Sequence, residues 1–129
     1  SDSDPIGLFT YVARELNKLD LAYLHLIEPR ILGLVEDERR DQNPVASQLI
    51  RQHYKGTLIA AGGFSGESAN AILEAGDADL VAFGRHFIAN PDLPERLRNG
   101  WPLNPYDRES FFGGTEVGYT DYPFHTEVA

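Results

Sequence analysis

Three short apolar runs, at residues 21–27, 57–61 and 79–83, alternate with segments that have helical periodicity. Each run is too short for a buried helix, and its nearly unbroken apolar character indicates a strand that is buried on both faces. Such strands are typical of parallel sheets, whose successive strands are joined by right-handed helical crossovers. The sequence therefore predicts an α/β fold, with an opening helix followed by about three strand–helix units.

Capping signals predict where the helices begin. Asp4 followed by Pro5 predicts the start of the first helix, because an acidic N-cap and a proline at the first position both suit a helix N-terminus. Ser65 and Asp92 are predicted to cap two later helices. A short helical turn is expected over residues 86–89.

Two segments lack this regular pattern. Residues 28–43 include the charged run 36–41 and predict a long loop, which is either a solvated surface excursion or a candidate lid. The pair at 43–44, Asn and Pro, then predicts another helix start. Residues 101–129 hold half of the aromatic residues, which argues against a disordered tail. We expect residues 1–129 to belong to a single domain, with 101–129 as an aromatic-rich C-terminal tail packed on the rest.

Composition excludes several kinds of partner. Asp and Glu number 20 against 11 Lys and Arg, so a net charge of −9 does not attract nucleic acid or an anionic membrane surface. The chain has no cysteine, and its four histidines lack metal-ligand spacing, so no metal site is expected. No apolar run can span a bilayer and no signal segment opens the chain, which predicts a cytoplasmic protein.

Glycine-rich loops follow the second and third predicted strands. Gly62, Gly63 and Phe64 come after one strand, and Gly84 and Arg85 come after the next. Ligands of parallel sheets bind at the carboxyl ends of the strands, where glycine lets main-chain N–H groups approach an anion and arginine adds a fixed charge. The pair of loops matches the phosphate site that barrel enzymes build after their last two strands. Either loop alone is better explained as a turn, but together they favour phosphate binding.

Other polar residues near the strands give weaker signals. His25 lies within the first apolar run, where a packed core histidine is expected. Glu28 and Arg30 follow this run, and they either face a site at its carboxyl end or form a loop-capping pair, which is the interpretation that we favour. No arrangement of nucleophile and base, and no carboxylate pair, assigns a catalytic residue within this segment.

The glycine loops belong to a longer pattern that resembles a known family. The runs GGF at 62–64, FGRHFIANPDL at 83–93 and GYTDYP at 118–123 resemble the C-terminal part of the old yellow enzymes, as do PLN at 102–104 and YDR at 106–108. The opening helix and the first predicted strand fit the same family, so the resemblance covers essentially the whole chain. The motifs are similar to those of bacterial ene reductases and plant oxophytodienoate reductases.

The resemblance implies an FMN-dependent oxidoreductase (ene reductase) built on a TIM (β/α)8 barrel. Such enzymes take hydride from NAD(P)H and reduce the activated C=C bond of α,β-unsaturated carbonyl compounds (enones). Phe112 is implied to line the substrate pocket, at a position where the family often has a tyrosine. By position, the resemblance assigns the FMN phosphate to five residues: Gly62, Gly63, Phe64, Gly84 and Arg85.

The number of predicted strands falls short of a complete barrel. A closed barrel needs eight strands and typically ~250 residues, whereas this chain has 129 residues and about three strand–helix units. We therefore expect the C-terminal portion of a barrel, to be completed by another chain or by a missing N-terminal segment. The N-terminal part of the same barrel, as a second chain, is the expected partner, and it would carry the catalytic residues. Two alternatives stay open: another phosphate-binding barrel enzyme, and a non-catalytic fragment that is active only with its N-terminal partner.

Overall fold

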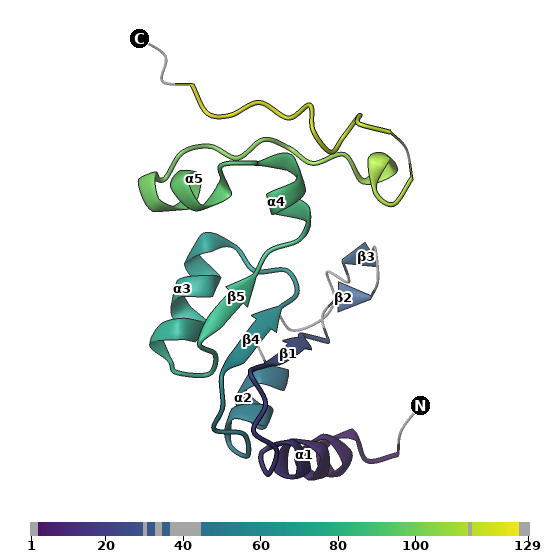
Figure 1. Ribbon diagram of the computed structural model, residues 1–129, viewed down its shortest axis with the longest axis vertical. Coiled ribbons are helices and arrows are strands. Elements are labelled where there is room, and N and C mark those ends of the chain that lie inside the picture. The colour runs from purple at the N-terminus through teal and green to yellow at the C-terminus, as the bar shows by residue number, and fades with distance from the viewer. Residues whose placement is uncertain (1–2, 30, 33–34, 37–44, 114, 127–129) are drawn as a thin grey trace. The chain divides into compact units, whose positions relative to one another are not determined.

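The computed structural model describes residues 3–29, 31–32, 35–36, 45–113 and 115–126. The chain divides into two compact units, Ser1–Ala82 and Phe83–Ala129, and each is described by itself (Figure 1). A single domain with a packed tail stays a prediction. No helix within the described ranges is long and apolar enough to cross a membrane.

A parallel sheet forms the centre of the first unit. Within the described residues its strands are β1 (Leu24–Ile27), β4 (Leu58–Ala61) and β5 (Leu80–Ala82), in the order β1-β4-β5 (Figure 1). Both pairings are parallel, and Ala61 lies opposite Ala82. The predicted α/β fold is therefore confirmed in its strands and in their direction.

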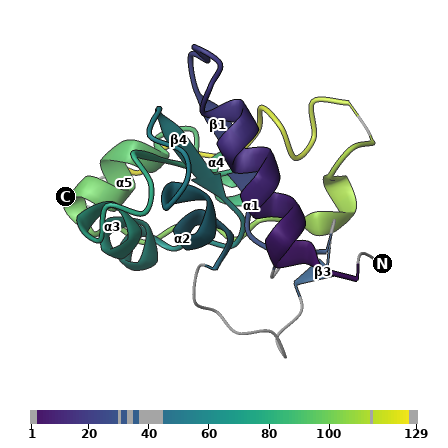
Figure 2. The same cartoon turned by 90° about the horizontal axis from the view of Figure 1, so that it is seen from below.

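Two helices cover one face of this sheet. Helix α1 (Pro5–Leu16) packs on α2 (Ala46–Arg51), and α2 contacts β1 and β4 (Figure 2). The backbone N–H of Gly7 donates to the Asp4 carboxylate at 2.9 Å, which confirms the predicted cap. The hydrophobic core here is centred on Ala13, Ile50, Tyr54 and Leu58, with Leu16, Leu24 and Leu26 packed against it.

The prediction that the strands are buried on both faces is wrong for β1 in the described structure. Leu24 and Leu26 are half-buried against the helices, but His25 and Ile27 alternate with them and are exposed. Successive side chains of a strand point to opposite faces, and α1 and α2 cover only one of them. The expectation of a packed core histidine at His25 is wrong for the same reason.

Helix α3 (Gly66–Glu74) follows β4 and contacts β5. Ser65 is its N-cap: the Ser65 hydroxyl accepts from the Ser68 N–H at 3.2 Å, while the Ser68 hydroxyl accepts from the Ser65 N–H at 2.9 Å. This reciprocal pair satisfies two N–H groups that a helix start leaves without partners, and it confirms the predicted cap.

The Asp79 carboxylate links the start of β5 to β4 and α2. Oδ2 of Asp79 accepts from the Leu58 N–H at 2.8 Å and from the Arg51 guanidinium at 2.5 Å. The Leu58 N–H and then Arg51 hold the pKa of Asp79 below its usual value, against a smaller opposing effect of burial. The carboxylate therefore helps to keep three neighbouring elements in register.

A buried carboxylate joins the end of β1 to the start of α2. Glu28 is fully buried and accepts hydrogen bonds from the backbone N–H groups of Val45, Ala46 and Ser47, each at 3.0 Å. The Ser47 hydroxyl also donates to it. Glu28 thus has a structural role with the start of a helix as its partner. The favoured pair of Glu28 with Arg30 stays a prediction, because Arg30 lies outside the described residues.

The predicted loop between β1 and α2 contains some regular structure. Strands β2 (Ile31–Leu32) and β3 (Val35–Glu36) pair in an antiparallel manner. The charged run at 36–41 beyond Glu36, and the predicted helix start at 43–44, lie outside the described residues.

The second unit consists of short helices and an extended tail. Helix α4 (Arg85–Ala89) confirms the short helix predicted after the third strand, and α5 (Leu93–Asn99) follows it. The tail contains one described turn of 3-10 helix, η1 (Arg108–Ser110). Side-chain hydrogen bonds join other described residues of the tail to α4 and α5.

Replacing Glu28 should destabilise the first unit strongly. Glu28→Ala leaves three buried or part-buried N–H groups at the start of α2 without their acceptor, and we expect unfolding free energy to fall by about 3 kcal/mol. The measurement is urea unfolding of the protein that contains this chain.

Glu15→Ala is the matched control, because Glu15 pairs with Lys18 on an exposed face of α1. Removing such a pair should change the unfolding free energy by less than about 0.5 kcal/mol. Equal effects of the two substitutions would show that burial of Glu28 does not contribute to stability.

Candidate functional site

The loop after β4 has a backbone that favours glycine. Gly62 and Gly63 have φ values of 109° and 68°, in the left-handed region that residues with a side chain rarely adopt. Phe64, which follows them, is buried, and Ser65 then begins α3. The carboxyl end of β4 thus exposes main chain without side chains, as an anion-binding loop requires.

A further glycine, Gly84, follows the end of the neighbouring strand β5. Gly84 follows Ala82 by two positions, and a Cβ at Gly84 would meet no atom within 4 Å. Since Ala61 pairs with Ala82, the carboxyl ends of β4 and β5 lie side by side. Of the predicted site residues, Gly62, Gly63 and Phe64 belong to the first unit, and Gly84 and Arg85 belong to the second.

Arg85 is the first residue of α4, and an aromatic ring of the tail lies against it. The Cζ atom of Arg85 is 5.3 Å from the centroid of the Tyr106 ring, and that of Arg108 is 5.6 Å from the same ring. The His86 ring meets Tyr106 edge-on at 5.5 Å. The sequence indicated Tyr106 only as part of the run at 106–108 and gave no sign of its contact with Arg85, because sixteen residues separate it from the end of α4 and no periodic pattern relates them.

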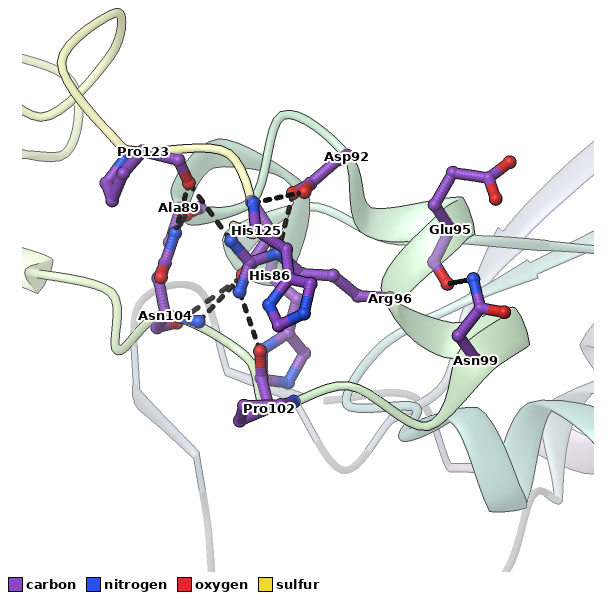
Figure 3. A network of polar contacts seen from close by, with 11 residues as sticks. His86, Ala89, Asp92, Glu95, Arg96, Asn99, Pro102, Asn104, Pro123 and His125 are labelled. Atoms are coloured by element: carbon purple, nitrogen blue, oxygen red, sulfur yellow. Dashed lines mark hydrogen bonds and ion pairs between the residues drawn. The ribbon is translucent and has the colours of Figure 1, made fainter. Parts of the chain in front are cut away.

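A buried arginine ties the two ends of the tail to α5 (Figure 3). Arg96 is 3% exposed; its Nε donates to the Asp92 carboxylate at 2.6 Å, and its terminal nitrogens donate to the carbonyls of Pro102 at 2.6 Å and Pro123 at 3.0 Å. A guanidinium can satisfy several acceptors in one plane, which a lysine cannot. The spacing of Asp92 and Arg96 by four residues was the only sequence signal for this contact.

Asp92 has a role other than the predicted one. It is the N-cap of α5 by position, but its side chain makes no capping hydrogen bond. Instead its second oxygen accepts from the His125 N–H at 2.6 Å, and the His125 ring stacks on Trp101 at 4.1 Å (Figure 3). The prediction of a capping side chain is therefore wrong, because the tail and Arg96 occupy both carboxylate oxygens.

A pair of asparagines, of which Asn104 is labelled in Figure 3, binds the tail to the end of α4. The Asn104 N–H donates to the Asn90 side chain at 2.7 Å, and the Asn104 amide donates to the carbonyls of Ala89 at 2.8 Å and Pro123 at 2.9 Å. Asn90, fully buried, donates to the His86 carbonyl at 2.8 Å. The tail is thus an ordered part of the second unit.

Phe112 has a strained and exposed conformation. Its φ of 62° is in the left-handed region, and its side chain is 83% exposed. The Phe112 N–H donates to the Tyr119 hydroxyl at 2.8 Å, which holds the backbone in this conformation. A bulky residue in such a conformation is uncommon and often accompanies function.

The fold and the strand ends together define an α/β protein of the TIM-barrel type, in which a parallel sheet carries glycine-rich loops at its carboxyl edge. The family model for the NADH:flavin oxidoreductase / NADH oxidase family matches residues 4–104. The chain therefore belongs to this family. The predicted relationship to the old yellow enzymes is confirmed at the level of the family.

Similar proteins of known name agree with this membership. The 12-oxophytodienoate reductase 1 of Oryza sativa subsp. japonica is 46% identical over 131 residues, which cover 98% of this chain and 33% of that protein. Morphinone reductase in complex with tetrahydroNAD is 45% identical with a TM-score of 0.81, over 98% of this chain and 32% of the other.

The old yellow enzyme from Trypanosoma cruzi is 36% identical with a TM-score of 0.83, over 97% of this chain and 31% of the other. The chain thus spans about a third of the length of the relatives that it matches. Its sheet and helices form part of a TIM barrel, as predicted.

Acid should release the tail from α5. Burial raises the pKa of Asp92, but the hydrogen bonds from the His125 N–H and from Arg96 together lower it by more. The pKa of Asp92 therefore lies below its ordinary value of 3.8. A lowered carboxyl pKa stabilises the folded state above about pH 4, and that stabilisation is lost as the pH falls through the folded-state pKa. We expect the emission maximum of Trp101, the single tryptophan, to stay constant from pH 7 to about 5 and to shift to the red below about 4.

Asp92→Asn is the comparison for this titration. Its Trp101 emission should already be red-shifted at pH 7 and should show no further acid transition of this kind. An Asp92→Asn protein that keeps the transition of the parent would assign the acid release to another group.

Proposed function

We propose that this chain forms part of an FMN-dependent NAD(P)H oxidoreductase, an ene reductase that acts on activated C=C bonds of α,β-unsaturated carbonyl compounds. One observation carries the proposal: a member of the NADH:flavin oxidoreductase family has glycine-rich main chain at the carboxyl ends of two adjacent parallel strands. When bound, FMN would supply the redox chemistry between the nicotinamide and the alkene. The residues of this chain would bind and orient it.

In this proposal the FMN phosphate is bound by Gly62, Gly63, Phe64, Gly84 and Arg85. The positive φ values of Gly62 and Gly63 fit a loop whose N–H groups accommodate an anion. One residue, Phe83, links β5 to Gly84, so Gly84 and Arg85 follow the end of β5 closely along the chain. The Arg85 guanidinium suits a phosphate because it can donate two parallel hydrogen bonds.

The barrel requires strands beyond those described here. β1 and β5 each pair only with β4 among the described strands, and Ile27 on β1 and Leu80 on β5 are 66% and 52% exposed. Strand edges and apolar side chains of this kind are normally covered. We propose that the N-terminal part of the barrel, as a second chain, pairs with these edges and supplies the catalytic residues.

Phe112 is the proposed substrate-pocket residue of this chain. Its exposed ring and the backbone held by Tyr119 present an apolar surface without a hydroxyl. We propose small enones as substrates and the cytoplasm as the location, with no nucleic acid or membrane as partner. The net charge of −9 supports this choice of partners.

The phosphate site is tested by Arg85→Ala in the assembled flavoprotein. We expect FMN binding to weaken by about 1.5–3 kcal/mol, the range for hydrogen bonds to charged groups. The Kd is measured by flavin fluorescence titration of the protein from which FMN has been removed.

Arg98→Ala is the matched control, because Arg98 pairs with Glu95 on the exposed face of α5 and should leave the FMN Kd unchanged. An unchanged Kd in Arg85→Ala would remove Arg85 from the phosphate site. A protein without the blue absorption of flavin and without enone-dependent NADPH oxidation would overturn the proposed function as a whole.

Phe112→Tyr should alter substrate selectivity more than FMN binding. The new hydroxyl can donate to a substrate oxygen, and one such hydrogen bond changes kcat/KM for a suitable enone by about fivefold. Steady-state kinetics over several enones that differ around the carbonyl would measure this. The same kcat/KM ratio for every enone in the two proteins would place Phe112 outside the substrate pocket.

A further inference from the structure

The tail of the second unit spans helix α4 from one end to the other. Asn104 is bound to Ala89 and Asn90 at the C-terminal end of α4, and Tyr106, two residues later, lies against Arg85 at its start. Two extended residues span about 7 Å, and the four steps from Arg85 to Ala89 rise about 6 Å along a helix. The tail therefore runs antiparallel to α4 over its full length.

Tyr106 is held from both sides along the chain. Asn104 anchors the backbone before it, and the Asp107 N–H after it donates to the Tyr122 hydroxyl at 3.0 Å. The Tyr106 ring is half-buried and also lies 6.0 Å from the ring of Phe111. A ring supported in this way is a fixed surface for a neighbouring side chain.

We propose that Tyr106 is a positioning residue, whose ring holds the Arg85 guanidinium ready for the FMN phosphate. This role rests on the proposed function of Arg85. A guanidinium over an aromatic face is attracted by the ring quadrupole, and the ring restricts the many rotamers that an arginine otherwise samples. Less ordering is then required when the phosphate binds.

An aromatic ring suits this purpose better than a carboxylate does. A carboxylate would neutralise the guanidinium and compete with the phosphate for the same donors, whereas a ring face brings no net charge. The same ring also lies within 5.6 Å of the Arg108 guanidinium. Tyr106 thus gathers two positive charges at the start of α4, which favours a dianionic ligand there.

The test compares FMN with riboflavin, which lacks the phosphate, in the assembled flavoprotein freed of its flavin. We expect Tyr106→Leu to raise the FMN Kd about tenfold, as loss of a cation–π contact implies. The riboflavin Kd should stay within about twofold, because no phosphate is present to need Arg85. Tyr106→Phe retains the ring and should bind both flavins like the parent.

A double-mutant cycle with Arg85→Met separates positioning from packing. If Tyr106 acts through Arg85, Tyr106→Leu should not weaken FMN binding further once Arg85 is replaced. Equal weakening of FMN and riboflavin by Tyr106→Leu, or an additive effect in the double variant, would overturn the positioning role. Should Tyr106→Leu fail to bind riboflavin because it does not fold, Tyr106→Met takes its place in the same cycle.

Failure of this inference is distinguishable from failure of the proposed function. If Arg85→Met weakens FMN binding but Tyr106→Leu does not, the phosphate site stands and the role of Tyr106 is overturned. If Arg85→Met leaves the FMN Kd unchanged, the proposed phosphate site fails, and the role of Tyr106 fails with it.

Discussion

Parallel pairing of β1, β4 and β5 is the constraint on which the rest of the first unit depends. Parallel strands all end at the same edge of a sheet, so the carboxyl ends of β1, β4 and β5 lie together at that edge without any further contact being needed. Helices α1 and α2 lie on the face of the sheet that carries Leu24 and Leu26, because these apolar side chains pack against them. His25 and Ile27 point to the other face. Two carboxylates complete the arrangement: the buried Glu28 holds the start of α2, and the exposed Asp79 links α2 to β4.

The second unit is organised differently. Its apolar core is small, and polar contacts hold much of its structure together. Arg96, Asp92, Asn90 and Asn104 are buried or half-buried, and most of their hydrogen bonds join the tail to α4 and α5. Buried polar groups are costly when any of them lacks a partner, so such a network favours one position of the tail over all others. The tail carries Tyr106 and Phe112, and a single position of the tail holds these two side chains in defined places.

Family membership and chain geometry support the proposed function in different ways. Membership of the NADH:flavin oxidoreductase family supports the proposed chemistry. The place where an anion would bind is supported by the left-handed backbone of Gly62 and Gly63 at adjacent strand ends. Neither depends on the other, since the backbone conformation would favour an anion in any parallel sheet. Among the described strands β1 and β5 pair only with β4, which is why the activity is proposed for an assembled barrel.

The sequence alone determined the features that depend on neighbouring residues. Apolar runs predicted β1, β4 and β5, and the cap residues Asp4 and Ser65 predicted two helix starts. Gly62, Gly63 and Gly84 predicted the loops after β4 and β5, whereas β2 and β3 were not predicted. Tertiary structure decided the rest, because the partners come from distant positions: the hydrogen bonds of Glu28, Arg96 and Asp92 reach across 19, 27 and 33 residues. Local sequence pattern does not select among such partners. Only the folded chain determines which polar groups are buried together and therefore have to form hydrogen bonds with one another.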